Sequence, residues 1–200
     1  MTKLLELIAQ RNSEEALKLI PMLTLDELRN RYTSQGFEAY TALHIAALLG
    51  LDQIVKSLID YGADVQARDG MNRLPMHYAA ETCEGAETQS KMRIFRHLHQ
   101  AESFLIFDTD KDLNTPLHIA AMYGETDLVK ELLNLGSGPY VKNKEGLVPR
   151  DLVPIEKVEL AKLLRSSEMS LTLMAMSHHD LLCGALINLV NKKKHYPYFS

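Results

Sequence analysis

The chain has 200 residues, of which 46% are hydrophobic and 24% are charged, and its net charge is -4 with a pI near 6.1. This balance argues against nucleic-acid binding, which needs a basic stripe, because the one basic run is the short Lys192-Lys193-Lys194. Two cysteines, Cys83 and Cys183, give no disulfide framework, and the first ten residues do not form a signal peptide. We therefore expect a cytoplasmic protein that has no nucleic acid as partner.

The N-terminal residues 1–35 predict two short amphipathic helices, from Lys3 to Gln10 and from Ser13 to Leu19. Ser13 stands ahead of two glutamates, in the place of an N-cap residue. A further helical turn is expected from Leu25 to Arg31. This region lacks the motif that follows it, so we interpret it as N-terminal capping helices or a degenerate first repeat.

A four-residue motif recurs along the rest of the chain. Its copies, the fourth of them decayed, are Thr41-Ala42-Leu43-His44, Leu74-Pro75-Met76-His77, Thr115-Pro116-Leu117-His118 and Val148-Pro149-Arg150-Asp151. Successive copies are 33, 41 and 33 residues apart. Each of the first three is followed by a pair of alanines and then by a helical pattern of apolar residues. Each copy therefore predicts a helix, a turn and a second helix, and the alanines let neighbouring helices approach closely.

The motif, the alanine pair, the apolar pattern and the period of 33 residues resemble ankyrin repeats. The resemblance implies an all-α fold, a solenoid of stacked helix–turn–helix units with short β-hairpin connectors. We expect the repeats over residues 36–165, divided into 36–68, 69–109, 110–142 and 143–165. Residues 166–200 are expected to form a C-terminal capping helix and a tail.

The second repeat is eight residues longer than its neighbours. The excess falls in the segment from Glu81 to Ser90, which predicts an extended connection before an outer helix near Lys91 to His99. This insertion is either tolerated loop length or a contact loop for a partner. Farther on, Phe104 and Phe107 occupy the next connector, where they either cover the outer helix or form an exposed patch that marks a partner site.

The hairpin tips depart from the family pattern. The glycine of the pattern is present at Gly146 and is replaced by Ala39, Asn72 and Leu113. Asparagine tolerates the left-handed backbone conformation, whereas leucine does so only at a cost. The hairpin before the third repeat is therefore expected to differ from the standard one.

Catalytic chemistry has little support in the residues. His44, His77 and His118 are one repeat apart, too far to share a metal ion, and the resemblance gives them hydrogen bonds that tie neighbouring repeats together. His178, His179, Asp180 and Cys183 cluster on one predicted helix, where a nucleophile, a base and an orienting group cannot converge. Phosphate-binding, dinucleotide-binding, hydrolase and zinc motifs are absent from the sequence. We expect no enzyme activity, no cofactor and no metal.

The resemblance places the functional positions of the array at the hairpin tips and on the exposed face of the inner helices, which line a concave groove. The positions assigned in this way to partner binding are Leu48, Leu49, Met71, Arg73, Glu81, Thr82, Lys111, Asp112, Asn114, Met122 and Tyr123. The apolar anchors are expected at Leu48, Leu49, Met122 and Tyr123, where a solvated surface would favour polar residues. Packing against the insertion is the alternative role for these apolar residues.

These observations predict a non-enzymatic module, monomeric when alone, that binds another protein through the concave groove. Ankyrin modules of this size resemble both host-cell scaffold subunits and effectors that intracellular bacteria deliver into eukaryotic cells, so the host cytosol is a second expected location. The alternatives are a regulatory or targeting subunit of an enzyme, or an enzyme with its site in the C-terminal segment. Attachment to a membrane surface through residues 170–194 is disfavoured, because a single amphipathic helix with three lysines binds a membrane only weakly.

Overall fold

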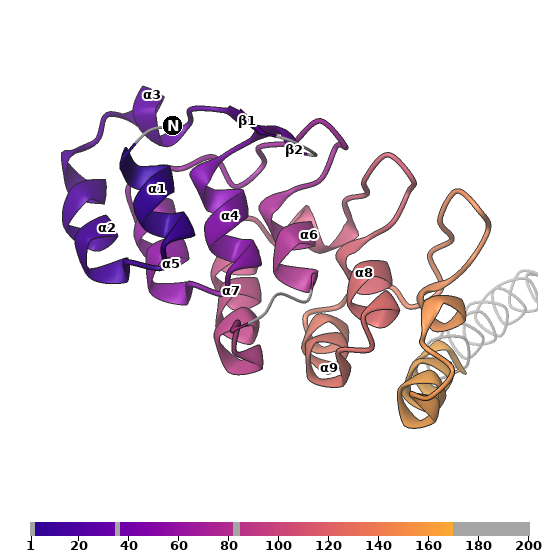
Figure 1. Cartoon of the computed structure of the whole chain (residues 1–200). Coiled ribbons are helices and arrows are strands. Elements are labelled where there is room, and N and C mark those ends of the chain that lie inside the picture. Colours follow the sequence, from indigo (N-terminus) through magenta and orange to yellow (C-terminus); the bar gives the residue numbers. More distant parts are fainter. Residues whose placement is uncertain (1–2, 35–36, 82–84, 170–200) are drawn as a thin grey trace, which may run out of the picture.

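The computed structural model describes residues 3–34, 37–81 and 85–169, which form a row of paired helices (Figure 1). The α-helices are α1 (Lys3–Ala9), α2 (Ser13–Leu19), α3 (Leu25–Leu28), α4 (Ala42–Leu48), α5 (Asp52–Asp60), α6 (Pro75–Ala80), α7 (Thr88–Ala101), α8 (Pro116–Met122) and α9 (Thr126–Asn134), followed by a helix over residues 158–169. The 3₁₀ turns are η1 (Ile20–Met22), η2 (Ser103–Phe107) and η3 (Pro149–Leu152). The strands β1 (Tyr32–Ser34) and β2 (Phe37–Tyr40) form an antiparallel hairpin. The predicted fold class is confirmed.

The helices stack in two rows. The inner row consists of α1, α4, α6, α8 and η3, each packed against the next, and the outer row of α2, α5, α7 and α9 is stacked in the same way (Figure 1). The alanine pairs of the inner helices are almost completely buried between the rows, as predicted; they are Ala46, Ala47, Ala79, Ala80, Ala120 and Ala121. Because each repeat buries its apolar residues only against its neighbours, the core is continuous along the stack. We propose the repeat boundaries given above as the limits of these units; the expected C-terminal cap and the residues from His178 to Cys183 lie outside the described part of the chain.

A buried histidine ties each of the inner helices α4, α6 and α8 to the next repeat. Nδ1 of His44 accepts from the backbone N–H of Thr41 at 3.1 Å and thereby caps α4, so Nε2 carries the proton and donates to the carbonyl of Arg73 at 3.1 Å. The two equivalent contacts in the following repeats are those of His77 with the carbonyl of Asn114 and of His118 with the carbonyl of Leu147, each at 3.2 Å. The predicted structural role of the histidines is confirmed.

The hairpin tips share one geometry, and the expectation that the hairpin at Leu113 would differ is wrong. Ala39, Asn72 and Leu113 have φ values of 59°, 63° and 60°, in the left-handed region that Gly146 also occupies. The hydrogen bond that closes the tip runs from Asp69 to Arg73 at 3.0 Å and recurs one repeat later from Asp110 to Asn114 at 3.0 Å. The stacked repeats therefore impose the conformation on leucine, at a cost of about 1–2 kcal/mol.

Backbone hydrogen bonds also join one tip to the next. The N–H of Lys111 donates to the carbonyl of Met71 at 3.0 Å, and that of Lys144 donates to the carbonyl of Asp112 at 2.9 Å. The tips of three successive hairpins are therefore held at a fixed mutual spacing. The side chains that they carry are presented from a row of linked turns.

One predicted N-cap residue and one predicted helix start are wrong. Asn12, rather than Ser13, is the N-cap of α2, and its side chain accepts from the N–H of Glu15 at 3.3 Å. Helix α7 begins at Thr88, three residues before the predicted start. The side chains that its first turn buries are those of Ser90 and Lys91, which are polar. The periodicity of apolar residues could not reveal this turn, and the connection in the insertion is correspondingly shorter.

Two of the buried histidines, His44 and His77, make the stability of the fold depend on pH. Burial lowers the pKa of both His44 and His77 to about 4, below the value near 6.5 of an unfolded chain. Their contribution is therefore fully present above about pH 6.5 and is lost as the pH falls toward 4. We expect the free energy of unfolding to decline over this range by up to about 1.4 kcal/mol per pH unit for each histidine. Urea titrations at several pH values measure how steeply the free energy of unfolding falls with pH. His77→Gln should reduce this slope by the contribution of about one proton. Equal slopes for the variant and the wild type would contradict the assignment.

Gly146 tests the conformational demand of the tips. Its φ is +81°, and a Cβ built there meets nothing within 4 Å, so a side chain would suffer from the backbone conformation alone. We expect Gly146→Ala to lower the free energy of unfolding by about 1 kcal/mol in a urea titration. The exposed neighbour Glu145 provides the control, since Glu145→Ala should change the value by less than about 0.5 kcal/mol. A neutral Gly146→Ala would show that the tip relaxes.

Candidate functional site

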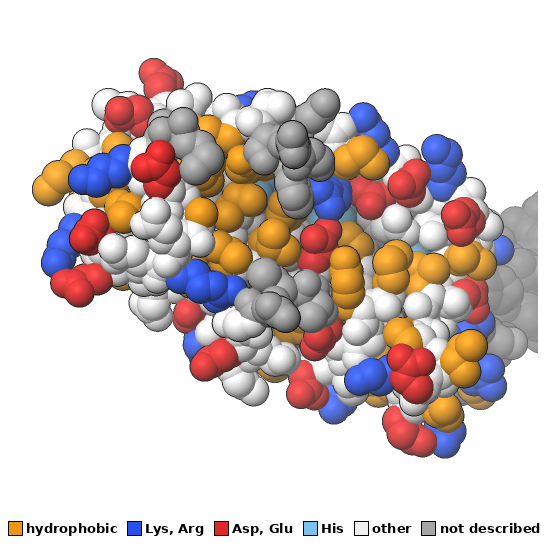
Figure 2. All heavy atoms as spheres, in the orientation of Figure 1, with side chains coloured by type: hydrophobic (Ala, Val, Ile, Leu, Met, Phe, Trp, Pro, Cys, Tyr) orange, Lys and Arg blue, Asp and Glu red, His pale blue; other side chains and the backbone are white. Residues whose placement is uncertain are grey.

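The exposed side of the inner helices, together with the hairpin tips, is called the inner face below. Figure 2 shows hydrophobic side chains gathered over the inner helices, with charged side chains on the hairpins above them and on the outer helices below. Among the residues predicted to bind a partner, Met71 at a tip and Met122 and Tyr123 at the end of α8 are 46%, 44% and 45% exposed. These three apolar side chains face solvent rather than the core.

A cluster of charged side chains lies at the middle of the inner face. The guanidinium of Arg73 donates to Asp69 at 2.9 Å, to Glu81 at 2.7 Å and to the hydroxyl of Tyr78 at 2.9 Å, and it lies 4.5 Å from the centroid of the Tyr78 ring. The Tyr78 hydroxyl donates in turn to Asp69 at 2.8 Å. Asp69 also accepts the backbone N–H groups of Met71 and Arg73, so the cluster fixes the shape of the tip before α6.

The pKa values of these groups reflect their pairing. Burial opposes ionisation of Asp69, yet hydrogen bonds from the Arg73 N–H and the Tyr78 hydroxyl, and the charge of Arg73, hold its pKa below the usual range. Burial raises the pKa of Glu81, and the charge of Arg73 offsets only part of this. Burial followed by the charge of Glu81 raises the pKa of Tyr123. Tyr123 therefore lies within the electric field of the cluster, so α6 and α8 contribute to one surface.

The insertion is held against the first repeat, beside the predicted anchors Leu48 and Leu49. Arg11 donates to the carbonyl of Leu49 and to that of Gly85, both at 3.1 Å. A Cβ on Gly50 would lie 2.9 Å from the Cβ of Ala86, so the two chains touch there. Leu48 and Leu49 are half-buried against the core. The insertion therefore lies next to the backbone of this segment, at Leu49 and Gly50.

The remaining predicted residues lie at the tip between the second and third repeats or next to it. Lys111 and Asp112 are exposed, and Asp112 lies 3.7 Å from the ammonium of Lys144. Asn114 is half-buried, and its side-chain oxygen accepts from Asn143 at 3.0 Å. Thr82 lies outside the described residues.

Sequence reasoning missed the residues that organise this surface from beneath. Tyr78 is fully buried and pairs with Asp69 across nine positions, and the centroids of its ring and the His44 ring lie 4.9 Å apart in a T-shaped arrangement. Lys91 is buried and donates to the carbonyl of Glu81. A tyrosine in a helix position that is otherwise occupied by Ile45 and Ile119 was the available signal for a polar partner.

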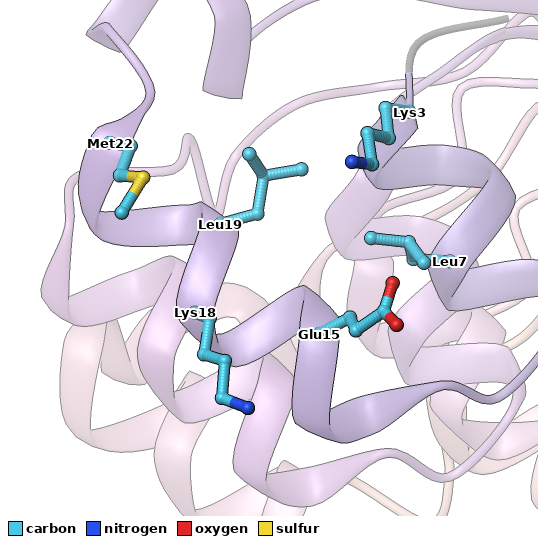
Figure 3. Close-up of a pocket in the computed structure, with 6 residues that line it drawn as sticks. All are labelled: Lys3, Leu7, Glu15, Lys18, Leu19 and Met22. Atoms are coloured by element: carbon cyan, nitrogen blue, oxygen red, sulfur yellow. The ribbon is translucent and has the colours of Figure 1, made fainter.

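Three hollows among the described residues are large enough for a small molecule. The largest has a volume of about 380 Å³ between α1 and α2 (Figure 3), and the side chains that line it are Lys3, Leu7, Glu15, Lys18, Leu19 and Met22. In the close-up, Leu7 and Leu19 come from different helices on opposite sides of the hollow. Its lining offers alkyl groups and mobile surface charges but no nucleophile with an adjacent base. A second hollow, of about 300 Å³, lies under Arg11 and the insertion, and a third, of about 250 Å³, adjoins the first.

Metal binding and membrane spanning find no support in the described residues. Residues 3–34, 37–81 and 85–169 hold no group of three or more His, Cys, Asp or Glu side chains placed to bind a metal ion. In the same ranges no helix is long and apolar enough to cross a membrane. Neither observation concerns residues 170–200.

The central cluster should stabilise the fold far more than a surface pair does. The Asp69 side chain is 1% exposed and that of Arg73 is 17% exposed, whereas the pair of Arg68 and Asp108 is 36% and 39% exposed. We expect Arg73→Ala to cost about 2–4 kcal/mol in a urea titration, because it leaves a buried carboxylate without its counter-ion. Arg68→Ala, the matched control, should cost less than about 1 kcal/mol. Equal losses would show that the cluster is as weak as a solvated pair.

Comparison with known proteins agrees with this architecture. A family model described as "Ankyrin repeats (3 copies)" matches residues 5–89, and another, "Ankyrin repeats (many copies)", matches residues 98–153. The tyrosine-protein kinase Shark of Drosophila melanogaster is 30% identical over 147 residues, which are 73% of this chain and 15% of that protein. Ankyrin repeat and SOCS box protein 16 of Mus musculus is 34% identical over 116 residues, 56% of this chain and 24% of that protein.

A third relative, NF-kappa-B inhibitor alpha of Sus scrofa, is 31% identical over 101 residues, 48% of this chain and 30% of that protein. The chain thus spans less than a third of each of these relatives. The matched models, the stacked helix pairs and the linked hairpins agree, and the chain belongs to the ankyrin-repeat family.

Proposed function

We propose that the chain binds a partner protein through the inner face, with Met122 and Tyr123 of α8 and Met71 of the preceding tip as apolar anchors. The pair of Arg73 and Glu81 and the tip residues Lys111, Asp112 and Asn114 orient the partner. Leu48, Leu49 and Thr82 complete the contact at the side of the insertion.

The observation that supports this proposal most is the exposure of Met122 and Tyr123 beside the charged cluster. Both side chains are nearly half exposed on an inner helix whose other apolar residues are buried. Aromatic and methionine side chains are enriched in protein interfaces, and the apolar centre of an interface is commonly surrounded by a polar rim. Leu48 and Leu49 are less available, because they pack against the core near the insertion.

The family supports a protein as the ligand. Ankyrin repeats indicate a protein–protein interaction module and are typically not catalytic. One relative, NF-kappa-B inhibitor alpha, is named for another protein that it inhibits. The central cluster of the inner face suits binding rather than catalysis. Its charged groups, Arg73, Asp69 and Glu81, are paired with one another and are not aligned with a nucleophile.

The proposal extends to a cytosolic site of action, including the host cytosol if the chain is an effector delivered by an intracellular bacterium. Its basis is the sequence pattern alone. A reporter fusion that signals entry into the eukaryotic cytosol tests delivery, and the absence of signal from an expressed fusion would exclude it.

The binding proposal is tested by affinity capture from a eukaryotic lysate with the full chain as bait. We expect the double variant Met122→Gln, Tyr123→Ala to capture at least about tenfold less of the partner protein than the wild type does, because anchor side chains contribute on the order of 2 kcal/mol each. Quantitative mass spectrometry measures the loss, and circular dichroism confirms that the variant is folded.

Tyr61 offers a matched control, since it is 46% exposed but follows the outer helix α5. Tyr61→Ala should capture the same protein as the wild type. Equal capture by the inner-face variant and the wild type would refute the proposed site. If only the Tyr61 variant failed to capture the protein, the binding site would lie on the outer row of helices.

A further inference from the structure

The turns that lead from an outer helix back to a hairpin present aromatic rings in two successive repeats. The repeats can be aligned on the backbone hydrogen bond that closes each hairpin tip. Its N–H donors in three successive repeats are Asp69, Asp110 and Asn143. Three residues before these positions stand Gln66, Phe107 and Tyr140. The residue before each of them points inward: Val65 is half-buried, and Ile106 and Pro139 are buried. Phe107 and Tyr140 therefore hold the same outward position one repeat apart.

The rings at these positions are exposed. Phe107 is 51% exposed and Tyr140 is 58% exposed. Phe104, which is 72% exposed, precedes Phe107 by three residues in η2, and side chains three residues apart in a 3₁₀ helix lie above one another. The two phenylalanines therefore face the same side. Of the two roles expected from the sequence, this exposure favours the exposed patch over cover for the outer helix.

Folding does not require these rings. The first repeat fills the same outward position with Gln66, which is exposed and polar. Three exposed aromatic side chains in two adjacent turns make an apolar patch of the kind that marks a binding surface. The patch follows outer helices, whereas the inner face is built from inner helices and tips.

The spacing of the rings fits a particular ligand conformation. Neighbouring helices pack about 8–10 Å apart, which sets the step between equivalent residues of adjacent repeats. A polyproline II helix advances about 9 Å in each turn of three residues. Prolines three positions apart can therefore each meet a ring of the next repeat, and exposed aromatic rings are the surfaces on which such segments dock. The Tyr140 hydroxyl can donate to a ligand carbonyl, which a polyproline II backbone leaves unpaired.

Charge beside the patch adds a second requirement. Lys142 follows Tyr140 by two residues in a chain whose exposure alternates, so both side chains lie on the same side. The equivalent residue of the first repeat, Arg68, is paired with Asp108 at 3.1 Å. Lys142 forms no ion pair within the described residues, and its ammonium is available to a carboxylate of a ligand.

We propose that Phe104, Phe107 and Tyr140 form a docking site for a proline-rich polypeptide segment in the polyproline II conformation. Prolines one turn apart rest on Phe107 and Tyr140, and an acidic residue next to the prolines pairs with Lys142. This site is independent of the inner face and gives the module a second, separate contact with a partner.

The test uses the full chain and a fluorescein-labelled synthetic peptide of about 12 residues, with proline at every third position and acidic residues at one end. Fluorescence anisotropy should show saturable binding that weakens as salt is added. A peptide with glycine in place of each proline keeps the charge but not the conformation, and it should bind at least about tenfold more weakly.

The matched variants are Phe107→Gln and Tyr140→Gln, which place at each position the residue that the first repeat uses. We expect each to weaken binding by about tenfold or more and Lys142→Ala to remove most of the salt dependence. Tyr61→Gln, a change at another exposed tyrosine, should leave binding unchanged, and thermal unfolding by circular dichroism confirms that each variant is folded.

The proposal is overturned if the proline peptide does not bind, if the glycine peptide binds equally well, or if both glutamine variants bind as the wild type does. The inner-face variant Met122→Gln, Tyr123→Ala should bind the peptide normally. Failure of this site therefore leaves the inner-face proposal untouched, and the reverse also holds.

Discussion

The structure depends on a buried imidazole that forms hydrogen bonds in two directions. In each of three repeats the histidine caps its own helix with one ring nitrogen and reaches the backbone of the next repeat with the other. A neutral ring with a fixed tautomer is the only form that can accept on one side and donate on the other. The contact sets both the start of α4, α6 and α8 and the distance from each to the next hairpin, so the helix stack and the row of tips share one spacing.

The second repeat adds a different constraint to this regular frame. Its buried tyrosine, Tyr78, brings Asp69 and Arg73 together, and the cluster holds the start of the insertion through Glu81. Arg11 holds the far side of the insertion from the N-terminal helices. The insertion is thus held at Glu81 and at Gly85. The apolar side chains of the inner helices that are most exposed are those of Met122 and Tyr123, at the end of α8.

Much of the fold could be predicted from the sequence, because the repeat period and the alanine pairs report contacts between neighbours in the stack. The paired helices, the role of His44 and the outer helix of the second repeat follow from such local patterns. The first turn of α7 could not be predicted, since polar Ser90 and Lys91 occupy its buried face. Leu113 was misjudged because propensity describes a residue alone, whereas the tip is held by bonds to its neighbours.

The candidate site was less predictable than the fold. The resemblance indicates which positions face outward, but it cannot say which of their charges are already paired. Arg73, one of the proposed contact residues, already donates to three acceptors of its own repeat. The contact of Arg11 with Gly85 joins residues 74 positions apart, and no periodic pattern reports such a pair.

The backbone bonds between successive tips restrict how such a molecule can change. Lys111 and Lys144 each donate to the tip before them, so adding or removing a residue in one hairpin would break its register with both neighbours. Exposed tip side chains such as those of Met71 and Lys111 can be exchanged without breaking these links, because the bonds between tips involve only backbone atoms. Variation in length is confined to places such as the start of the second outer helix. A lineage of such chains would therefore be expected to diversify its tips by substitution and its insertion by length.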